Sequence, residues 1–453
     1  MQCSAKMKAF IGGGIALCVG VLWLTPFTLT KGNQTTDPEI VASQGSSDPH
    51  FKKMDEISGI ALAGFLDESG SPLLWGHEEQ TSRLILIRTR PTGSLYVGEI
   101  TLPGNKTRDA EDIAAVHSNG KGTIYLEDAG SNRKDRPACV RYARKKGSPA
   151  QCTVADSIAQ SANTKNESGQ KNLKEACLAR GDDWIFLNET DYLAPGAHPA
   201  IRRIPEPSYQ DARRAKLAVG SATIEFEYPR VCGDKPCRDF PGNKMSDISA
   251  AYNVESLAVV AEPDHSHTAY LFTKAPLSLA HVLHNQRPHA AACKFDSDGL
   301  SDVFRLRNID SLPPAKLHQA EYVTTRDFSD NAGLPDREDS LDRVTAADFL
   351  QLSDSQGLLL VKTTGHAYKW PISLAGDKEI KGKPSTMFDI AGSLKNIKPV
   401  LAAVQATSKK QGVGRRNQEA ATQLDESTVY YMGECKGLPK CSVAMVHDKL
   451  PTR

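Results

Sequence analysis

The pattern of apolar and polar positions from about residue 54 onward consists of short apolar runs separated by Gly, Pro, Asn and Asp. Apolar residues at helical spacing are scarce, so the pattern predicts β-strands and restricts helices mainly to insertions. Within it, a two-part phrase recurs five times. A small or acidic residue enters an apolar strand, and a second strand with a polar end follows.

Each copy of the phrase has two halves, one for each strand. The first halves are Ser58–Ala61, Glu111–Ala114, Glu255–Ala258, Ala347–Leu350 and Glu419–Thr422. The second halves are Leu74–Glu78, Ile124–Asp128, Tyr270–Lys274, Leu359–Lys362 and Tyr430–Glu434. A repeated strand–turn–strand unit cannot bury its own faces, so the copies must stack on one another.

Two further runs after the first phrase, Arg83–Ile87 and Ser94–Ile100, complete a unit of four strands. Four antiparallel strands per repeat are the blade of a β-propeller, so the sequence predicts an all-β propeller over residues 54–453. Five copies favour five blades. The alternative is a sixth blade in the degenerate sequence between residues 295 and 335.

The last unit has only three strands of its own, ending at Ser442–Val446. We expect a strand from the N-terminal side, near Ile40–Ala42 or Phe51–Lys52, to complete this blade and close the ring. The second unit has its outer strands at Ala200–Ile204 and Ala222–Tyr228.

Between the second and third strands of that unit lies an insertion over residues 137–198, which carries three cysteines and Trp184. A structureless loop of this length is uncommon in a compact domain. We therefore expect the insertion to be held by a disulfide.

The N-terminal sequence is typical of a targeting segment. Lys6 and Lys8 precede an uncharged stretch over residues 9–30, so residues 1–30 are predicted to be a signal peptide or a signal anchor. Residues 31–53 are small and polar and read as a linker. We expect the body of the protein to be periplasmic or extracellular, either released or anchored in the inner membrane by residues 9–30.

Export makes the eight cysteines beyond the targeting segment candidates for disulfides. The expected pairs are Cys232 with Cys237, Cys435 with Cys441, Cys139 with Cys152, and Cys177 with Cys293. The first two close short loops. The sequence does not fix the connectivity.

The net charge of the chain limits the classes of binding partner to expect. The chain has 55 Lys and Arg against 54 Asp and Glu, a net charge of +1. This balance gives no reason to expect a nucleic acid. We expect a monomer that meets the membrane only through its N-terminal segment, with a small anionic ligand or a protein as partner.

An ordered set of motifs resembles a family of secreted bacterial β-propeller proteins, some of them lipoproteins. The motifs include Glu56–Gly59, Leu74–His77, Arg108–Ala114, Asp128–Arg133 and Val254–Val259. The resemblance covers most of residues 54–450 outside the insertions. It implies the propeller fold and export, and it implies no particular activity.

The start of the first strand and the end of the second lie at the same end of an antiparallel pair, and the first strand lines the channel of a propeller. The polar residues of every copy are therefore expected at one mouth. The carboxylates there are candidate ligands for a divalent cation, Ca²⁺ or Mg²⁺: Glu111, Asp112, Asp128, Glu255, Asp348 and Glu419. The basic residues expected at the same mouth are candidates for binding a small anion: Arg108, Lys274, Lys362 and Arg416.

The alternative to both kinds of site is a purely structural role, in which these charged residues pair with one another and hold the blades in register. The leading functional hypothesis is an exported propeller that binds a small ligand, a metal ion or a partner at the mouth. The first alternative is a metal-dependent hydrolase, lactonase- or phosphoesterase-like, with His77 or Glu111 as the base. The second is a surface protein-interaction module that uses the insertion at residues 137–198.

Overall fold

The structure is a computed structural model of the whole chain. It describes residues 39–45, 57–78, 81–89, 95–103, 110–118, 120–129, 138–159, 167–187, 198–217, 220–229, 231–232, 235–236, 254–273, 283, 286–287, 294–295, 300–328, 344–363, 366–374, 387–397, 399–404, 420–432 and 440–447. The account that follows concerns these residues.

Five antiparallel sheets share one pattern, in which successive strands lie side by side. The first sheet contains β2 (Ile57–Leu66), β3 (Pro72–Glu78), β4 (Arg83–Arg88) and β5 (Tyr96–Thr101). The second contains β6 (Ile113–Ser118), β7 (Lys121–Asp128), β11 (Ala200–Pro205) and β12 (Ala222–Glu227). The third contains β15 (Val254–Ala261), β16 (His267–Thr273), β18 (Leu300–Leu306) and β20 (Glu321–Asp327).

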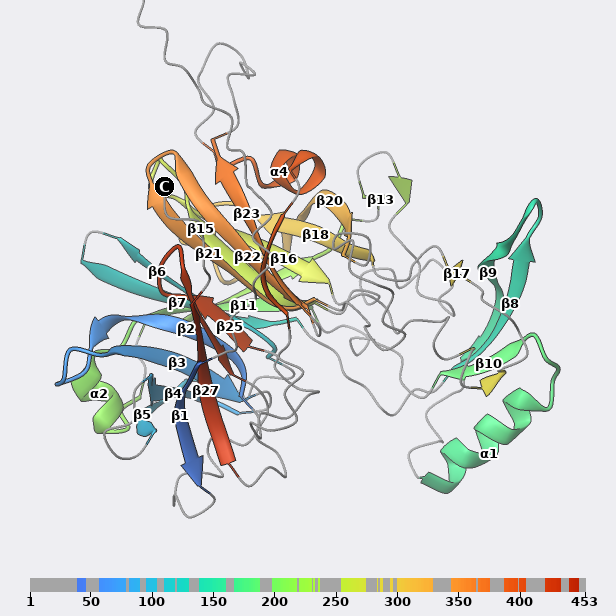
Figure 1. Cartoon of the computed structure of the whole chain (residues 1–453), viewed down its shortest axis with the longest axis horizontal. Helices are drawn as coiled ribbons and strands as arrows, with labels where there is room; N and C mark the ends of the chain where they lie inside the picture. Colours follow the sequence, from blue (N-terminus) through green and yellow to red (C-terminus); the bar gives the residue numbers. More distant parts are fainter. Residues whose placement is uncertain are drawn as a thin grey trace, which may run out of the picture.

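The fourth sheet contains β21 (Val344–Ser353), β22 (Gln356–Thr363), β23 (His366–Ser373) and β24 (Val400–Val404). The fifth contains β25 (Ala420–Gln423), β26 (Thr428–Met432), β27 (Lys440–His447) and β1 (Glu39–Gly45). The first strands of the sheets, β2, β6, β15, β21 and β25, each pack against the next, and β25 packs against β2. This closed ring confirms the predicted β-propeller of antiparallel blades (Figure 1).

The ring closes through the N-terminal side of the chain. Strand β1 pairs antiparallel with β27, with Ile40 opposite Ala444 and Ala42 opposite Val443. The strand predicted near Ile40–Ala42 is therefore confirmed as the outer strand of the fifth sheet. Described residues between 295 and 335 supply β18 and β20 to the third sheet and the short β19 (His318–Gln319), which pairs with β12 of the second.

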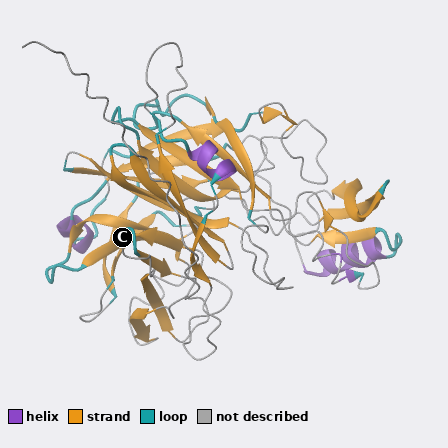
Figure 2. Cartoon of the chain, turned by 45° about the horizontal axis from the view of Figure 1, so that its top comes forward, coloured by secondary structure: helices purple, strands orange, loops and turns teal. Residues whose placement is uncertain are grey.

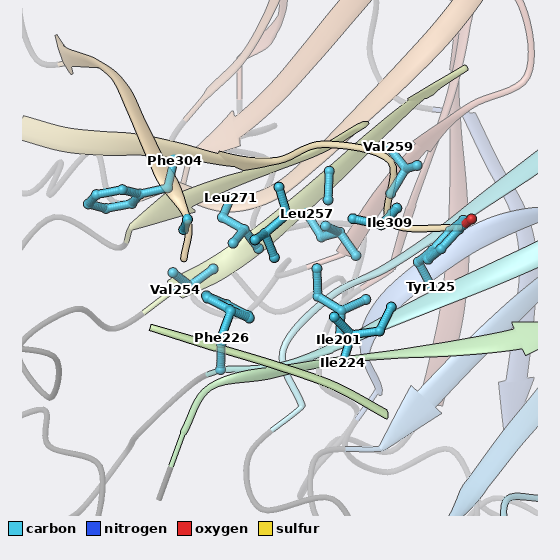
Figure 3. Close-up of a cluster of buried hydrophobic side chains, with 14 of the residues drawn as sticks. Tyr125, Ile201, Ile224, Phe226, Val254, Leu257, Val259, Leu271, Phe304 and Ile309 are labelled. Carbon is cyan, nitrogen blue, oxygen red and sulfur yellow. The ribbon is translucent and has the colours of Figure 1, made fainter. Parts of the chain in front are cut away.

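Apolar side chains fill the spaces between neighbouring sheets. Figure 3 shows the cluster between the second and third sheets, where Tyr125, Ile201 and Phe226 face Leu257 and Leu271. The inner strands are buried on both faces, as the unbroken burial of β16 shows. That explains why these strands read as continuous apolar runs rather than as alternating ones.

The insertion of the second sheet forms a separate small lobe beside the ring (Figure 1; Figure 2). We call this the insertion lobe; its elements, between β7 and β11, are β8 (Ala138–Lys145), β9 (Ser148–Ala159), α1 (Glu167–Leu178) and β10 (Trp184–Leu187). The two-residue strand β17 (Lys294–Phe295), from the third sheet's β16–β18 connection, pairs with β9 in parallel.

One disulfide lies in the lobe and differs from the predicted pairing. Cys139 is bonded to Cys177, with the Cα atoms 5.6 Å apart. This bond occupies both Cys139 and Cys177, so the predicted pairs Cys139–Cys152 and Cys177–Cys293 are wrong. In the β8–β9 hairpin, Cys152 lies opposite Arg144. Five residues of extended strand, about 17 Å, separate Arg144 from Cys139, too far for a disulfide. The pairs Cys232–Cys237 and Cys435–Cys441 each include a residue outside the described part.

Three small elements flank the ring: α2 (Tyr209–Arg213), α4 (Ile390–Asn396) and the hairpin of β13 (Val231–Cys232) and β14 (Lys235–Pro236). In the described part of the chain, no helix is long and apolar enough to span a bilayer. The predicted targeting segment, residues 1–30, lies outside that part.

A buried carboxylate ties the first two sheets together at one end of the ring. Glu206, just after β11, accepts hydrogen bonds from Gly64 N at 2.8 Å and Trp75 Nε1 at 2.9 Å. Its other oxygen lies 3.1 Å from His117 Nε2. Burial acts to raise the pKa of Glu206, but the bonds to His117, Gly64 and Trp75 outweigh it and hold the pKa below the usual 4.5.

Replacing this carboxylate by an amide, Glu206→Gln, should lower the free energy of unfolding at pH 7 by about 1–3 kcal/mol, because a buried acceptor is lost. Because the folded-state pKa is lowered, the carboxylate stabilises the fold above pH 4.5, and this contribution is lost as the pH falls further. Denaturant unfolding at pH 7 and pH 3.5 should therefore show the difference from the parent shrinking in acid.

The matched control is Glu68→Gln, which removes an exposed ion pair with Arg213 and should change stability by less than about 1 kcal/mol. A Glu206→Gln protein that unfolds like this control at pH 7 would contradict the role assigned to Glu206.

Candidate functional site

Strand register gives the true alignment of the repeated phrases. The pairing of the first with the second strand skips one residue at Ser58, at Glu255 and at Thr345. Each skip is a β-bulge, a device that re-aims side chains at a strand end. The residues after the bulges, Gly59, Ser256 and Ala346, then lie opposite the penultimate residues of the second strands.

This register corrects the alignment of the fourth copy. Ala346 and Ala347, opposite Lys362 and Val361, occupy the place that Asp112 and Ile113 hold in the second sheet. Asp348 lies two residues further along its strand than the sequence alignment put it. The pairing of β21 with β22 reveals this two-residue difference, which the residue types alone do not.

Asp112 is fully buried and links three sheets. Its Oδ1 accepts a hydrogen bond from Ile113 N at 2.8 Å. Its Oδ2 accepts from Leu257 N of the third sheet at 2.9 Å and from Ala347 N of the fourth at 3.1 Å. Burial raises the pKa of Asp112, and the three N–H groups act in the opposite direction. The carboxylate holds the starts of three inner strands at one end of the ring, which we call the entrance end.

Asp348 links the fourth sheet to the fifth in the same manner. Its carboxylate accepts from Gln423 N at 2.7 Å and from Thr422 Oγ1 at 3.1 Å. Burial raises the pKa of Asp348, and the hydrogen bonds from Gln423 and Thr422 oppose that rise. Two of the predicted metal ligands therefore bind the protein's own N–H and O–H groups and keep neighbouring blades in register.

His77 is the penultimate residue of β3 in the first sheet and lies close to Asp112. A methyl group at Gly59 would come within 2.9 Å of both His77 Nε2 and Asp112 Cα, so only glycine leaves room for the imidazole there. The ring is 1% exposed, and neither nitrogen has a hydrogen-bond partner in the described structure. Burial lowers the pKa of His77 to about 4, with the Glu78 backbone opposing the shift, so the imidazole is neutral at pH 7.

Glu127 holds the position in the second sheet that His77 holds in the first. It is fully buried, its Oε1 accepts from Ala129 N, and its Oε2 has no partner in the described structure. Burial raises the pKa of Glu127 well above its usual value, and the negative charges of Asp128, Asp112 and Glu255 raise it further. Asp128 was predicted from the sequence and Glu127 was missed, although Glu127 lies opposite Asp112.

Three buried hydroxyls join these two residues at the entrance end. Ser58, Ser256 and Thr345 are each at most 2% exposed, and their hydroxyl oxygens have no hydrogen-bond partner in the described part of the chain. We call the five residues together the entrance cluster: Ser58, His77, Glu127, Ser256 and Thr345. Most buried polar groups in proteins are hydrogen-bonded, so several unsatisfied ones from four sheets at one end of the ring make the entrance cluster the candidate site.

The remaining predicted residues divide into two groups. Glu111 and Glu255 are buried at the entrance end; Asp128 forms an ion pair with Arg202 at 3.4 Å, and the ammonium of Lys362 donates to Thr363 O. Others lie outside the described residues: Arg108, Lys274, Arg416 and Glu419. Among the residues that are described, no group of three His, Cys, Asp or Glu side chains is placed to hold a metal ion.

Comparison with known proteins finds low-identity similarity to solved structures alone. No family model matches the chain, and no curated protein does. Similar solved structures include a GH43_1 enzyme from Xanthomonas citri complexed with xylose (12% identity, 86% of this chain and 87% of that chain, TM-score 0.36). Another is the PQQ-bound aldose sugar dehydrogenase from Streptomyces coelicolor (11% identity, 91% and 97%, TM-score 0.29). At these TM-scores the likeness carries no argument about this chain, and the predicted membership of a secreted family stays a prediction.

Changing the central carboxylate to an amide, Asp112→Asn, should lower the free energy of unfolding by at least about 1–3 kcal/mol. An amide offers one acceptor and turns an NH₂ group toward backbone N–H donors, leaving at least one of them unsatisfied. Denaturant unfolding measures the change. The control Asp354→Asn, at the exposed β21–β22 turn, should shift stability by no more than about 0.5 kcal/mol, and an equal effect of the two changes would refute the bridging role.

Acid sensitivity offers a test of His77. Because its folded pKa of about 4 lies below the usual 6.5, the unfolded chain binds the proton first, and stability falls as the pH drops from 6.5 to 4. The expected loss from this one group is on the order of 3 kcal/mol. His77→Leu should remove that part of the pH dependence and be at least as stable at pH 7. A variant with the parent's pH dependence, measured by denaturant unfolding at pH 7 and pH 4, would rule out a buried neutral imidazole.

Proposed function

We propose that this chain is an exported β-propeller that binds a small, uncharged, hydroxyl-bearing ligand at its entrance cluster. The observation that carries the proposal is the cluster itself. Five buried side chains from four sheets direct polar atoms without hydrogen-bond partners, as far as the structure is described, to one end of the ring. An unsatisfied buried polar group costs about 1–3 kcal/mol, and binding sites are where such a cost is retained.

The chemistry of the cluster favours an uncharged ligand. Ser58, Ser256 and Thr345 each offer a hydroxyl that both donates and accepts. The neutral imidazole of His77 does the same, and the raised pKa of Glu127 favours the protonated carboxyl, which donates. Hydroxyl groups of a ligand would satisfy such a set without bringing a charge into a buried site.

Charged ligands fit the described residues less well. An anion would need a cation at the site, but the Lys362 ammonium already donates to Thr363 O, and Arg202 pairs with Asp128. A divalent cation would need several free carboxylates, but Asp112 and Asp348 are bound to N–H groups. The same point weighs against the metal-dependent hydrolase considered from the sequence.

Thermal unfolding in the presence of candidate ligands tests the proposal. A panel of neutral monosaccharides and polyols should contain at least one member that raises the Tm by several degrees at saturation. Inorganic phosphate and calcium chloride serve as charged comparisons and should have no such effect. Ser256→Ala and His77→Leu should each stay folded and lose the response, because each removes a polar group of the cluster.

Ser301→Ala is the matched control, since that buried hydroxyl already donates to Thr273 O at 2.7 Å, and it should keep the response. Stabilisation by phosphate or calcium alone would overturn the assignment of an uncharged ligand. A response that persists in both cluster variants, or no response to the whole panel, would overturn the site.

A further inference from the structure

A short segment of the third sheet's β16–β18 connection contacts the insertion lobe, which belongs to the second sheet. Arg287 N donates to Leu283 O at 2.6 Å, the i to i+4 bond of one helical turn. Residues at i, i+3 and i+4 share one face of a helix. Leu283, which is buried, therefore lies on the same face as Gln286 and Arg287, and the last two bind the lobe.

Arg287 caps helix α1 from more than a hundred residues away in sequence. Its NH2 donates to Leu178 O at 2.6 Å and to Gly181 O at 2.8 Å. Its Nε donates to Trp184 O at 3.4 Å, and its NH1 lies 3.5 Å from Asp182 Oδ1. The last carbonyls of a helix lack partners and favour a nearby positive charge. The last turn of α1 contains no basic residue, so Arg287 supplies the missing cation.

Gln286 covers the edge of the lobe's sheet. Its Oε1 accepts from Phe186 N at 2.8 Å, and its Nε2 donates to Phe186 O at 2.7 Å. Phe186 lies on β10, the end strand of the order β10-β8-β9-β17. An edge strand leaves backbone N–H and C=O groups open to pairing, and the amide of Gln286 takes up one such pair as a neighbouring strand would.

We propose that the insertion lobe carries a recognition surface for a helical turn of the form Leu-x-x-Gln-Arg, and that Leu283–Arg287 is its ligand within the same chain. The surface consists of backbone groups at the C-terminal end of α1 and the edge of β10. Arginine suits it because a guanidinium spreads five donors over three nitrogens in a fixed plane and so reaches carbonyls that lie apart, whereas the three donors of an ammonium share one nitrogen. Capture of this turn joins an insertion of the second sheet to the third sheet.

Hydrogen–deuterium exchange on the whole protein tests the surface. In a Gln286→Ala/Arg287→Ala variant, the amides of residues 178–187 should exchange at least about tenfold faster, while strands β2–β5 exchange as in the parent. A synthetic peptide of residues 281–288, added in millimolar excess to this variant, should restore protection at 178–187. The same peptide with lysine in place of the arginine should bind at least about tenfold more weakly.

Arg213→Ala, which removes an exposed ion pair with Glu68, is the control and should leave exchange in the lobe unchanged. Unchanged exchange at 178–187 in the double variant would overturn the proposal. Equal acceleration of the lobe and of β2–β5 would do so as well, because it would reveal a global loss of stability. A native peptide that gives no protection would overturn recognition of the turn.

Discussion

The three N–H groups that converge on the carboxylate of Asp112 come from the first strands of the second, third and fourth sheets. Adjacent blades of a propeller are joined mainly by non-directional apolar packing, as in the cluster between the second and third sheets. Such packing tolerates sliding of one blade along the next. A buried carboxylate with fixed donors does not, because an unsatisfied donor or acceptor in the core is costly. Asp348 and Glu206 repeat the device at other blade junctions.

With the inner strands held in this register, the polar ends of the repeated phrase differ from sheet to sheet. In each sheet, a residue near the end of the second strand lies opposite a residue near the start of the first. These pairs are Gly59–His77, Asp112–Glu127, Ser256–Phe272, Ala346–Lys362 and Ala420–Met432. A purely architectural position would be filled by similar residues in every blade. Here Asp112 serves the architecture, and the cluster around it contains an imidazole, a carboxyl group with one unbonded oxygen, and hydroxyls without partners among the described residues.

The sequence predicted the architecture well for physical reasons. Apolar runs bounded by turn residues mark strands, and a unit with too few strands must borrow one, which is how the strand at Ile40–Ala42 could be anticipated. Features that depend on register could not be anticipated. The β21–β22 pairing places Asp348 two residues further along its strand than predicted, and the β8–β9 pairing places Cys152 far from Cys139. Glu127 was missed because its significance comes from the residue it faces across the sheet.

A high-resolution crystal structure would show whether the entrance end of the ring is a preorganised polar site. Solved both alone and with the neutral ligand that most raises the Tm, it should show ordered solvent in the first crystal and ligand hydroxyls in the second. These should lie within hydrogen-bond distance of at least two residues of the entrance cluster, His77 among them. If instead His77, Ser58 and Ser256 face only apolar protein atoms in both crystals, the entrance end is packing and the site does not exist.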